Sequence, residues 1–143
     1  MLSELEMKEL LLSARTIAVV GLSDRPERDS YSIAAFLLRQ GYRVLPVNPN
    51  LREPVLGQSP YASLRDIAEP VDIVNVFRRS EYVAGVVEEA IAIRAGAIWT
   101  QSGVEDLVAA RRAEAAGLKI VMDRCIATTY RLLRVERTQR ILE

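Results

Sequence analysis

The residues best suited to chemistry follow a short apolar run near the N-terminus. In Ile17-Ala-Val-Val-Gly-Leu-Ser-Asp-Arg-Pro-Glu-Arg-Asp-Ser-Tyr31, an expected buried strand runs into one glycine and then into a polar loop that opens a helix. A helix N-terminus offers unpaired backbone N–H groups and the positive end of the helix dipole, which together stabilise an anion. Arg25 and Arg28 of the loop can pair with phosphate oxygens. The segment therefore predicts a phosphate-binding loop that begins at Gly21.

The amino-acid composition limits the chemistry of this loop. The chain has 143 residues and no histidine, so it lacks the commonest general base near neutral pH and the commonest transition-metal ligand. Catalytic units of the Ser-His-Asp or Cys-His type are excluded. No Asp/Glu cluster has the spacing of a calcium loop. We therefore predict no catalytic residue and no metal site, and we favour binding over catalysis.

The charge balance bears on partners and location. Nineteen basic residues balance nineteen acidic ones, so no positive field attracts nucleic acid or an anionic membrane. No apolar run approaches the roughly 20 residues that span a bilayer, and the N-terminal segment has no signal-peptide pattern. We expect a cytoplasmic protein with one domain over residues 1–143 and no contact with nucleic acid or membranes. A homodimer or an unidentified protein partner is compatible with this sequence.

The elements that must position the loop follow from the hydrophobic pattern. Apolar runs alternate regularly with segments of helical period, which predicts an α/β fold with a parallel sheet covered on both faces. The predicted strands are 16–20, 42–47, 72–77, 97–100 and 119–122. The predicted helices are 3–15, 31–40, 63–68, 81–94 and 104–116, with a last one inside 123–143. Ser3 fits a capping box with Glu6, and Ser80 fits an N-cap. Right-handed crossovers favour a three-layer, Rossmann-like doubly wound sheet in the order 3-2-1-4-5, with its switch point between the first and fourth strands.

Ligands of doubly wound sheets bind beyond the carboxyl ends of the strands, so the candidate residues are those that follow each strand. They are Gly21, Ser23, Arg25, Arg28 and Ser30 after the first strand, Asn48 and Pro49 after the second, Arg78 and Arg79 after the third, Gln101, Ser102 and Gly103 after the fourth, and Asp123, Arg124 and Cys125 after the fifth. The dinucleotide fingerprint G-x-G-x-x-G is missing, and the second strand ends without the carboxylate that would bond a ribose. A hydride-carrying dinucleotide is thus disfavoured, whereas a pyrophosphate remains compatible.

Five separated motifs resemble those of the small stand-alone CoA-binding proteins, which are similar in fold to the N-terminal CoA-binding domain of the succinyl-CoA synthetase alpha subunit. The motifs are the Gly21 loop, Gly41-Tyr-Arg-Val-Leu-Pro-Val-Asn-Pro49, Val71-Asp-Ile-Val-Asn-Val-Phe-Arg-Arg-Ser-Glu81, Trp99-Thr-Gln-Ser-Gly-Val104 and Val121-Met-Asp-Arg-Cys125. The resemblance covers nearly the whole chain. It implies that coenzyme A or an acyl-CoA is bound in the strand-end crevice. After Cys125 the chain departs from the family pattern, which usually carries a charged residue in this segment.

The resemblance also implies a part of the ligand for each group of candidate residues. The pyrophosphate would be held by Gly21, Leu22 and Ser23 with the helix start at Ser30, Tyr31 and Ser32. Arg25 and Arg28 would meet phosphate charges, including the ribose 3′-phosphate that distinguishes coenzyme A from NAD. Asn48 and Pro49 would line the nucleotide side. Near the adenosine or its phosphates would lie Phe77, Arg78 and Arg79, and toward the pantetheine arm Gln101, Ser102 and Gly103.

Two classes of function remain. The first is a non-catalytic protein that binds coenzyme A or an acyl-CoA. The alternative is an NAD-type oxidoreductase or a non-catalytic subunit of an acyl-CoA synthetase. Succinyl-CoA synthetases use a histidine to carry phosphate, so this chain cannot perform that step alone. Cys125 is expected to be a small buried thiol; the alternative is a thiolate favoured by Arg124 that forms a mixed disulfide with coenzyme A.

Overall fold

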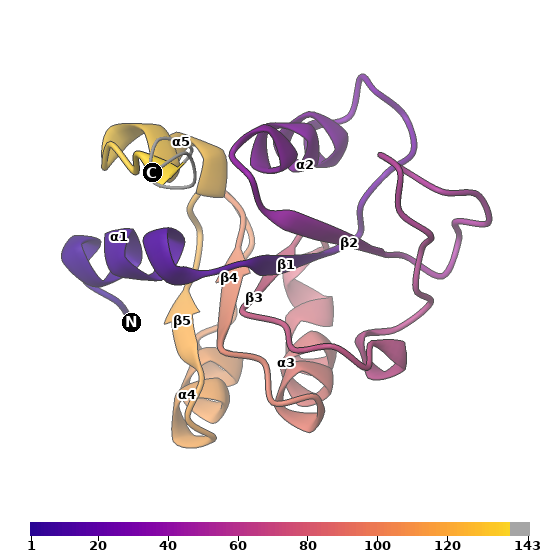
Figure 1. Ribbon diagram of the computed structural model, residues 1–143. Helices are drawn as coiled ribbons and strands as arrows, with labels where there is room; N and C mark the ends of the chain where they lie inside the picture. Colours follow the sequence, from indigo (N-terminus) through magenta and orange to yellow (C-terminus); the bar gives the residue numbers. More distant parts are fainter. Residues whose placement is uncertain (138–143) are drawn as a thin grey trace.

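The apolar runs of the sequence form the strands of one parallel sheet (Figure 1). In the computed structural model, which describes residues 1–137, the strands are β1 (Thr16–Val20), β2 (Arg43–Val47), β3 (Ile73–Val76), β4 (Ala97–Thr100) and β5 (Lys119–Val121). Every residue of β1, β3 and β4 is buried, as expected for strands covered on both faces. The predicted α/β, Rossmann-like fold class is confirmed.

Helices cover both faces of the sheet. The α-helices are α1 (Glu4–Ser13), α2 (Asp29–Arg39), α3 (Val83–Ala92), α4 (Leu107–Ala115) and α5 (Ile126–Leu132), and the short 3₁₀ turns are η1 (Leu64–Asp66) and η2 (Ser80–Tyr82). Side chains of α1, α2 and α5 build one hydrophobic core, and those of α3 and α4 build the other, on the opposite face (Figure 1). Within residues 1–137, none of the helices has the length and apolar character needed to cross a membrane.

The strand order differs from the prediction. The sheet runs β2-β1-β3-β4-β5, so the order 3-2-1-4-5 is wrong: β3 pairs with β1, with Ile73 beside Ile17. The strand β2 lies at the edge and contains Pro46, which lacks the N–H that an interior strand would donate. The Pro46 carbonyl accepts the Tyr61 N–H at 2.9 Å, so the following loop covers this edge. The switch point therefore lies between β1 and β3, not between the first and fourth strands.

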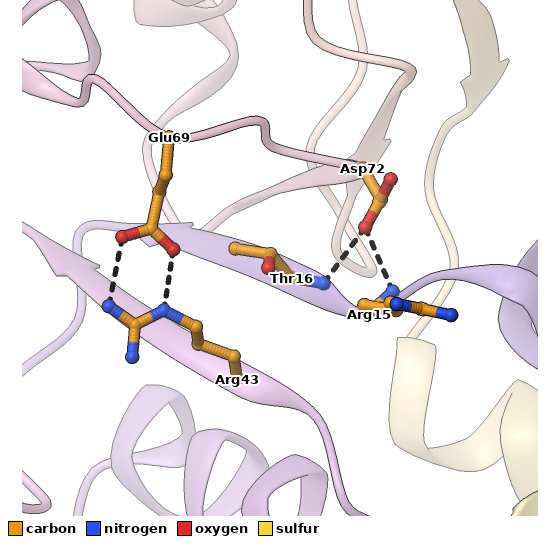
Figure 2. Close-up of polar contacts among 5 residues, drawn as sticks. All are labelled: Arg15, Thr16, Arg43, Glu69 and Asp72. Carbon is orange, nitrogen blue, oxygen red and sulfur yellow. Dashed lines mark hydrogen bonds and ion pairs between the residues drawn. The ribbon is translucent and has the colours of Figure 1, made fainter.

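Two carboxylates hold the strands together at the end of the sheet where the strands begin (Figure 2). The Asp72 Oδ2, directly before β3, accepts the backbone N–H groups of Arg15 at 2.8 Å and Thr16 at 2.9 Å, which ties the start of β3 to that of β1. Glu69 accepts two hydrogen bonds from the Arg43 guanidinium, which lower the pKa of the Glu69 carboxyl below its ordinary value. The Glu69–Arg43 pair is partly exposed and contributes little stability. Both contacts lie at the end of the sheet away from the carboxyl ends of the strands.

Hydrogen bonds at the helix ends show which of the predicted caps form. The capping box is confirmed, since the Glu6 N–H donates to Ser3 Oγ at 3.2 Å and the Ser3 N–H donates to Glu6 Oε1 at 2.9 Å. The predicted N-cap at Ser80 is wrong, because its hydroxyl accepts the Glu105 N–H at 2.9 Å and α3 begins at Val83. The last predicted helix appears as α5, which ends at Leu132, and the part of this prediction that falls on 138–143 lies outside the described residues.

Candidate functional site

The turn after β1 requires a glycine for two reasons. Gly21 has a φ of +88°, a conformation that side chains with a Cβ rarely adopt. A Cβ at this position would lie 2.5 Å from the Phe77 carbonyl oxygen. The Gly21 N–H donates to the Val47 carbonyl at 2.8 Å, and the Phe77 N–H donates to the Val20 carbonyl at 2.8 Å. The ends of β1, β2 and β3 are thereby drawn together around Gly21.

The loop from Gly21 is folded over the start of α2. Its hydrogen bonds are local: the Ser23 N–H donates to Ser30 Oγ at 3.0 Å, and the Arg25 N–H donates to Ser23 Oγ at 3.1 Å. Ser30 is buried in the first turn of α2, whereas Arg25 and Arg28 are exposed. Arg28 is the N-cap residue of α2, and its side chain makes no capping hydrogen bond. Both arginines thus come directly before α2 in the chain, as the sequence predicts for a phosphate loop.

This loop forms the wall of a first groove of about 640 Å³. The groove is lined by Gly21, Ser23, Asp24, Arg25, Glu27, Arg28, Asp29, Ser30 and Phe77. Its acidic members Asp24, Glu27 and Asp29 were not predicted to lie there, although they alternate with the arginines in the sequence. The groove therefore carries both signs of charge, and a bound phosphate would depend on where Arg25 and Arg28 place their donors rather than on a net positive field.

A second groove, also of about 640 Å³, adjoins the first and shares Asp29 and Phe77 with it. Its lining is Asp29, Ile33, Phe77, Arg78, Arg79, Ser80, Gln101, Ser102, Gly103, Val104 and Cys125. The predicted residues after β3 and β4 thus meet in one place. Ile33, Ser80 and Val104 were not predicted, because helix periodicity and caps do not reveal which side chain faces a crevice. The expectation of a buried Cys125 is wrong, since this thiol is only partly buried.

Polar contacts hold the walls of the second groove in place. The Gly103 N–H donates to Asp123 Oδ1 at 2.6 Å, and the Asp123 N–H donates to Thr100 Oγ1 at 3.1 Å. The Trp99 indole N–H donates to the Arg124 carbonyl at 2.8 Å, while the Arg124 guanidinium lies 3.5 Å from a Glu4 carboxylate oxygen. Asp123 and Arg124, both singled out from the sequence, therefore act here as supports for the β4 and β5 loops rather than as groove walls.

A third, smaller groove of about 260 Å³ lies across the ends of β1 and β2 on the α3 face of the sheet. It is lined by Val20, Val47, Pro49, Ala62, Ser63, Leu64, Arg78, Tyr82, Gly85, Val86 and Glu89. Arg78 lines both this groove and the second one, and its guanidinium carbon lies 4.7 Å from the centre of the Tyr82 ring. Arg78 therefore stands at the junction of two grooves, stacked on an aromatic face.

Four further predicted residues line none of these three grooves. Leu22 is fully buried, and its carbonyl accepts a hydrogen bond of 3.1 Å from Asn48 Nδ2. Tyr31, in the first turn of α2, packs against the core, and the Ser32 hydroxyl donates to the Asp29 carbonyl at 3.1 Å. Asn48 thus links the loops after β1 and β2, whereas Tyr31 and Ser32 belong to the first turn of α2.

Known proteins resemble this chain over most of its length. The sequence model of the CoA binding domain family matches residues 15–131. The chain belongs to the CoA binding domain family. The resemblance predicted from the five motifs is thereby confirmed. The uncharacterized protein YneT of Bacillus subtilis (strain 168) is 42% identical over 128 residues, which cover 90% of this chain and 94% of YneT.

Solved structures show the same fold. A Thermus thermophilus protein, cell-free ID.343, superposes with a TM-score of 0.88 at 38% identity, over 92% of this chain and 99% of that chain. A dinucleotide forming acetyl-coenzyme A synthetase 1 from Ca. Korarchaeum cryptofilum, solved with phosphate and ADP, gives a TM-score of 0.68 at 24% identity. That match covers 79% of this chain and 26% of the synthetase chain, so the fold of this family member also occurs as one part of a larger enzyme.

Proposed function

We propose that the protein binds coenzyme A or an acyl-CoA across the carboxyl edge of its sheet and catalyses no reaction by itself. The observation that carries this proposal is the family match over residues 15–131 together with the adjoining grooves at that edge. Coenzyme A is a long ligand with a charged nucleotide end and a less polar arm. Grooves of different character that share Phe77 and Arg78 suit such a ligand.

Each groove suits one part of the ligand. The first groove offers Arg25 and Arg28 to phosphate groups at the start of α2. The second has Ile33 and Val104 among its walls and suits the pantetheine arm. The third, with Pro49 and the Arg78 guanidinium over Tyr82, suits the nucleotide end. A ligand spanning all three would cross the switch point between β1 and β3, where doubly wound sheets bind ligands.

The non-catalytic role rests on the composition of the chain. Without histidine, the chain has no residue of the kind that carries phosphate in succinyl-CoA synthetases. An NAD-type oxidoreductase is disfavoured because Asn48 follows β2 where a carboxylate would bond the ribose, and both its polar ends bind backbone groups of Leu22 and Asn50. The match to one part of an acetyl-coenzyme A synthetase favours one second candidate, a non-catalytic synthetase subunit.

Calorimetric titration of the full chain with coenzyme A, 3′-dephospho-CoA and NAD tests the proposal. Coenzyme A should bind most tightly, because charge-assisted hydrogen bonds to its 3′-phosphate contribute about 1.5–3 kcal/mol each, which is roughly tenfold to a hundredfold in affinity. The variants Arg25→Ala and Arg28→Ala should reduce this advantage. Arg39→Ala, at the exposed opposite end of α2, is the matched control.

The outcomes separate the parts of the proposal. Tighter binding of NAD than of coenzyme A would overturn the assigned ligand. Equal binding of coenzyme A and 3′-dephospho-CoA would overturn the role of the two arginines while leaving the ligand in place. For the synthetase-subunit candidate, a partner chain that confers acyl-CoA synthesis on the mixture would decide in its favour.

A further inference from the structure

Two amide side chains lie buried against each other behind the second groove. Asn75 in β3 and Gln101 directly after β4 have exposed fractions of 0% and 5%. The Gln101 Nε2 donates to Asn75 Oδ1, and Gln101 Oε1 accepts the Ile126 N–H at 3.4 Å. Gln101 lines the groove, whereas Asn75 lies behind it. Within residues 1–137, the Asn75 Nδ2 has no hydrogen-bond partner.

The contacts of the pair show which amide group donates and which accepts each hydrogen bond. An amide side chain offers one carbonyl acceptor and an NH₂ group with two N–H bonds. The backbone N–H of Ile126 can only donate, so Gln101 must turn its oxygen toward Ile126 and its NH₂ toward Asn75. The Asn75 Oδ1 then accepts the hydrogen bond from the Gln101 NH₂ group. Each amide oxygen thereby accepts one hydrogen bond, and within residues 1–137 the unpaired N–H groups are both those of Asn75 Nδ2 and the second one of Gln101 Nε2.

This arrangement has a cost that an apolar pair would avoid. A buried donor without an acceptor destabilises the folded state, because the hydrogen bond that it makes to water in the unfolded chain is lost. Asn75 stands beside Val19 on β1 and Trp99 on β4, in strands whose residues are all buried. An aliphatic side chain would pack there without unpaired polar atoms. Gln101 is the member of the pair that lines the groove, so an acceptor supplied from outside the chain would meet its NH₂ group.

We propose that the Asn75–Gln101 pair recognises a carbonyl oxygen on the pantetheine or acyl part of the ligand, with Gln101 as the contacting residue and Asn75 as the positioning residue. This inference rests on the proposed binding of coenzyme A and adds what the second groove selects. The ligand can supply a carbonyl from two sources: the amides of the pantetheine arm or the thioester of an acyl-CoA. Both are uncharged acceptors, which match the unpaired N–H groups of the amide pair.

Titration calorimetry with four ligands tests the inference: adenosine 3′,5′-bisphosphate, coenzyme A, acetyl-CoA and S-ethyl-CoA, a thioether that lacks the thioester carbonyl. The variant Gln101→Glu replaces the NH₂ group by an acceptor oxygen at nearly unchanged shape. If the arm supplies the carbonyl, this variant should lose about tenfold in affinity for every ligand with a pantetheine arm and keep its affinity for the bisphosphate. If the thioester supplies it, only acetyl-CoA should lose affinity, and the wild-type preference for acetyl-CoA over S-ethyl-CoA should disappear.

Two results would overturn the inference, and they differ from each other. Unchanged affinity of Gln101→Glu for all four ligands, with wild-type protein that binds coenzyme A, refutes the role of the pair and leaves the proposed function standing. Wild-type protein that binds none of the ligands refutes both. Should thermal melting show that Gln101→Glu does not fold, the double variant Asn75→Leu with Gln101→Met removes both amides at once, a change that is milder for stability than removing one. The same losses are expected of it.

Discussion

Replacing Gly21 by alanine tests how the ends of β1 and β3 are held together. The new methyl group would lie 2.5 Å from the Phe77 carbonyl oxygen and 3.1 Å from its carbon. Both atoms belong to the backbone, which cannot turn aside as a side chain can. Either the turn after β1 or the end of β3 must therefore move, and both form walls of the first groove.

Two separate contributions set the loss of unfolding free energy that we expect for Gly21→Ala. A residue with a Cβ at a φ of +88° costs roughly 1–2 kcal/mol relative to glycine. Forcing backbone apart to admit an extra carbon adds about 1–3 kcal/mol. We therefore expect Gly21→Ala to lower the free energy of unfolding by about 2–5 kcal/mol, a large share of the roughly 5–15 kcal/mol typical of a domain.

Urea denaturation followed by circular dichroism measures this loss, with Gly117→Ala as the matched control. Gly117 has a similar φ of +92°, but a Cβ added to it would meet no atom within 4 Å, and it lines none of the three grooves. The control should lose only the conformational contribution of roughly 1–2 kcal/mol. Equal destabilisation by the two substitutions would refute the argument from the Phe77 contact.

Three further perturbations have defined outcomes. Cys125, the single cysteine, lines the second groove and should react with a maleimide more slowly once coenzyme A is bound; an unchanged rate would place the ligand elsewhere. Burial holds the pKa of the Tyr42 hydroxyl well above its ordinary value of 10.0. The folded protein therefore keeps this proton at a pH where the unfolded chain loses it. The free energy of unfolding should be unaffected by this group below about pH 10 and should fall as the pH rises further. Tyr42→Phe should flatten this loss in urea titrations at several pH values, at a cost of about 1 kcal/mol for the hydrogen bond to the Leu11 carbonyl. Asp72→Ala removes two hydrogen bonds at the far end of the sheet and should destabilise the protein by about 2–4 kcal/mol without changing its affinity for coenzyme A, whereas a parallel loss of affinity would contradict the separation of the two ends.

Much of the fold could be predicted because its signals are local. The five apolar runs, the capping box at Ser3 and the crossovers are properties of neighbouring residues, and the structure has them where the sequence places them. Strand order is not local, since β3 can follow β2 in the chain and still pair with β1. Pro46 did hold a signal, because an interior strand rarely contains proline. It marks β2 as the edge strand, but it does not say which strand lies on the other side of β1.

The groove residues can likewise be divided into those that the sequence predicts and those that it does not. Residues that directly follow a strand, such as Gln101 and Gly103, reach a groove because the strand carries them there. Those that depend on the packing of irregular segments, such as Ala62 in the third groove, could not be found from patterns. Asn75 is a case between the two: it is a lone polar residue inside an otherwise apolar strand, and that contrast is visible in the sequence.

The loop that follows β2 has a consequence for the behaviour of the protein in solution. Tyr61 binds the Pro46 carbonyl and accepts the Asn48 N–H at 2.9 Å, so it occupies the open edge of β2, while the next residues, Ala62 and Ser63, wall the third groove. An uncovered strand edge is a template for pairing with another chain. One segment thus both covers the edge of the sheet and forms a wall of the third groove. A ligand that holds this segment down would at the same time keep the protein from assembling edge to edge.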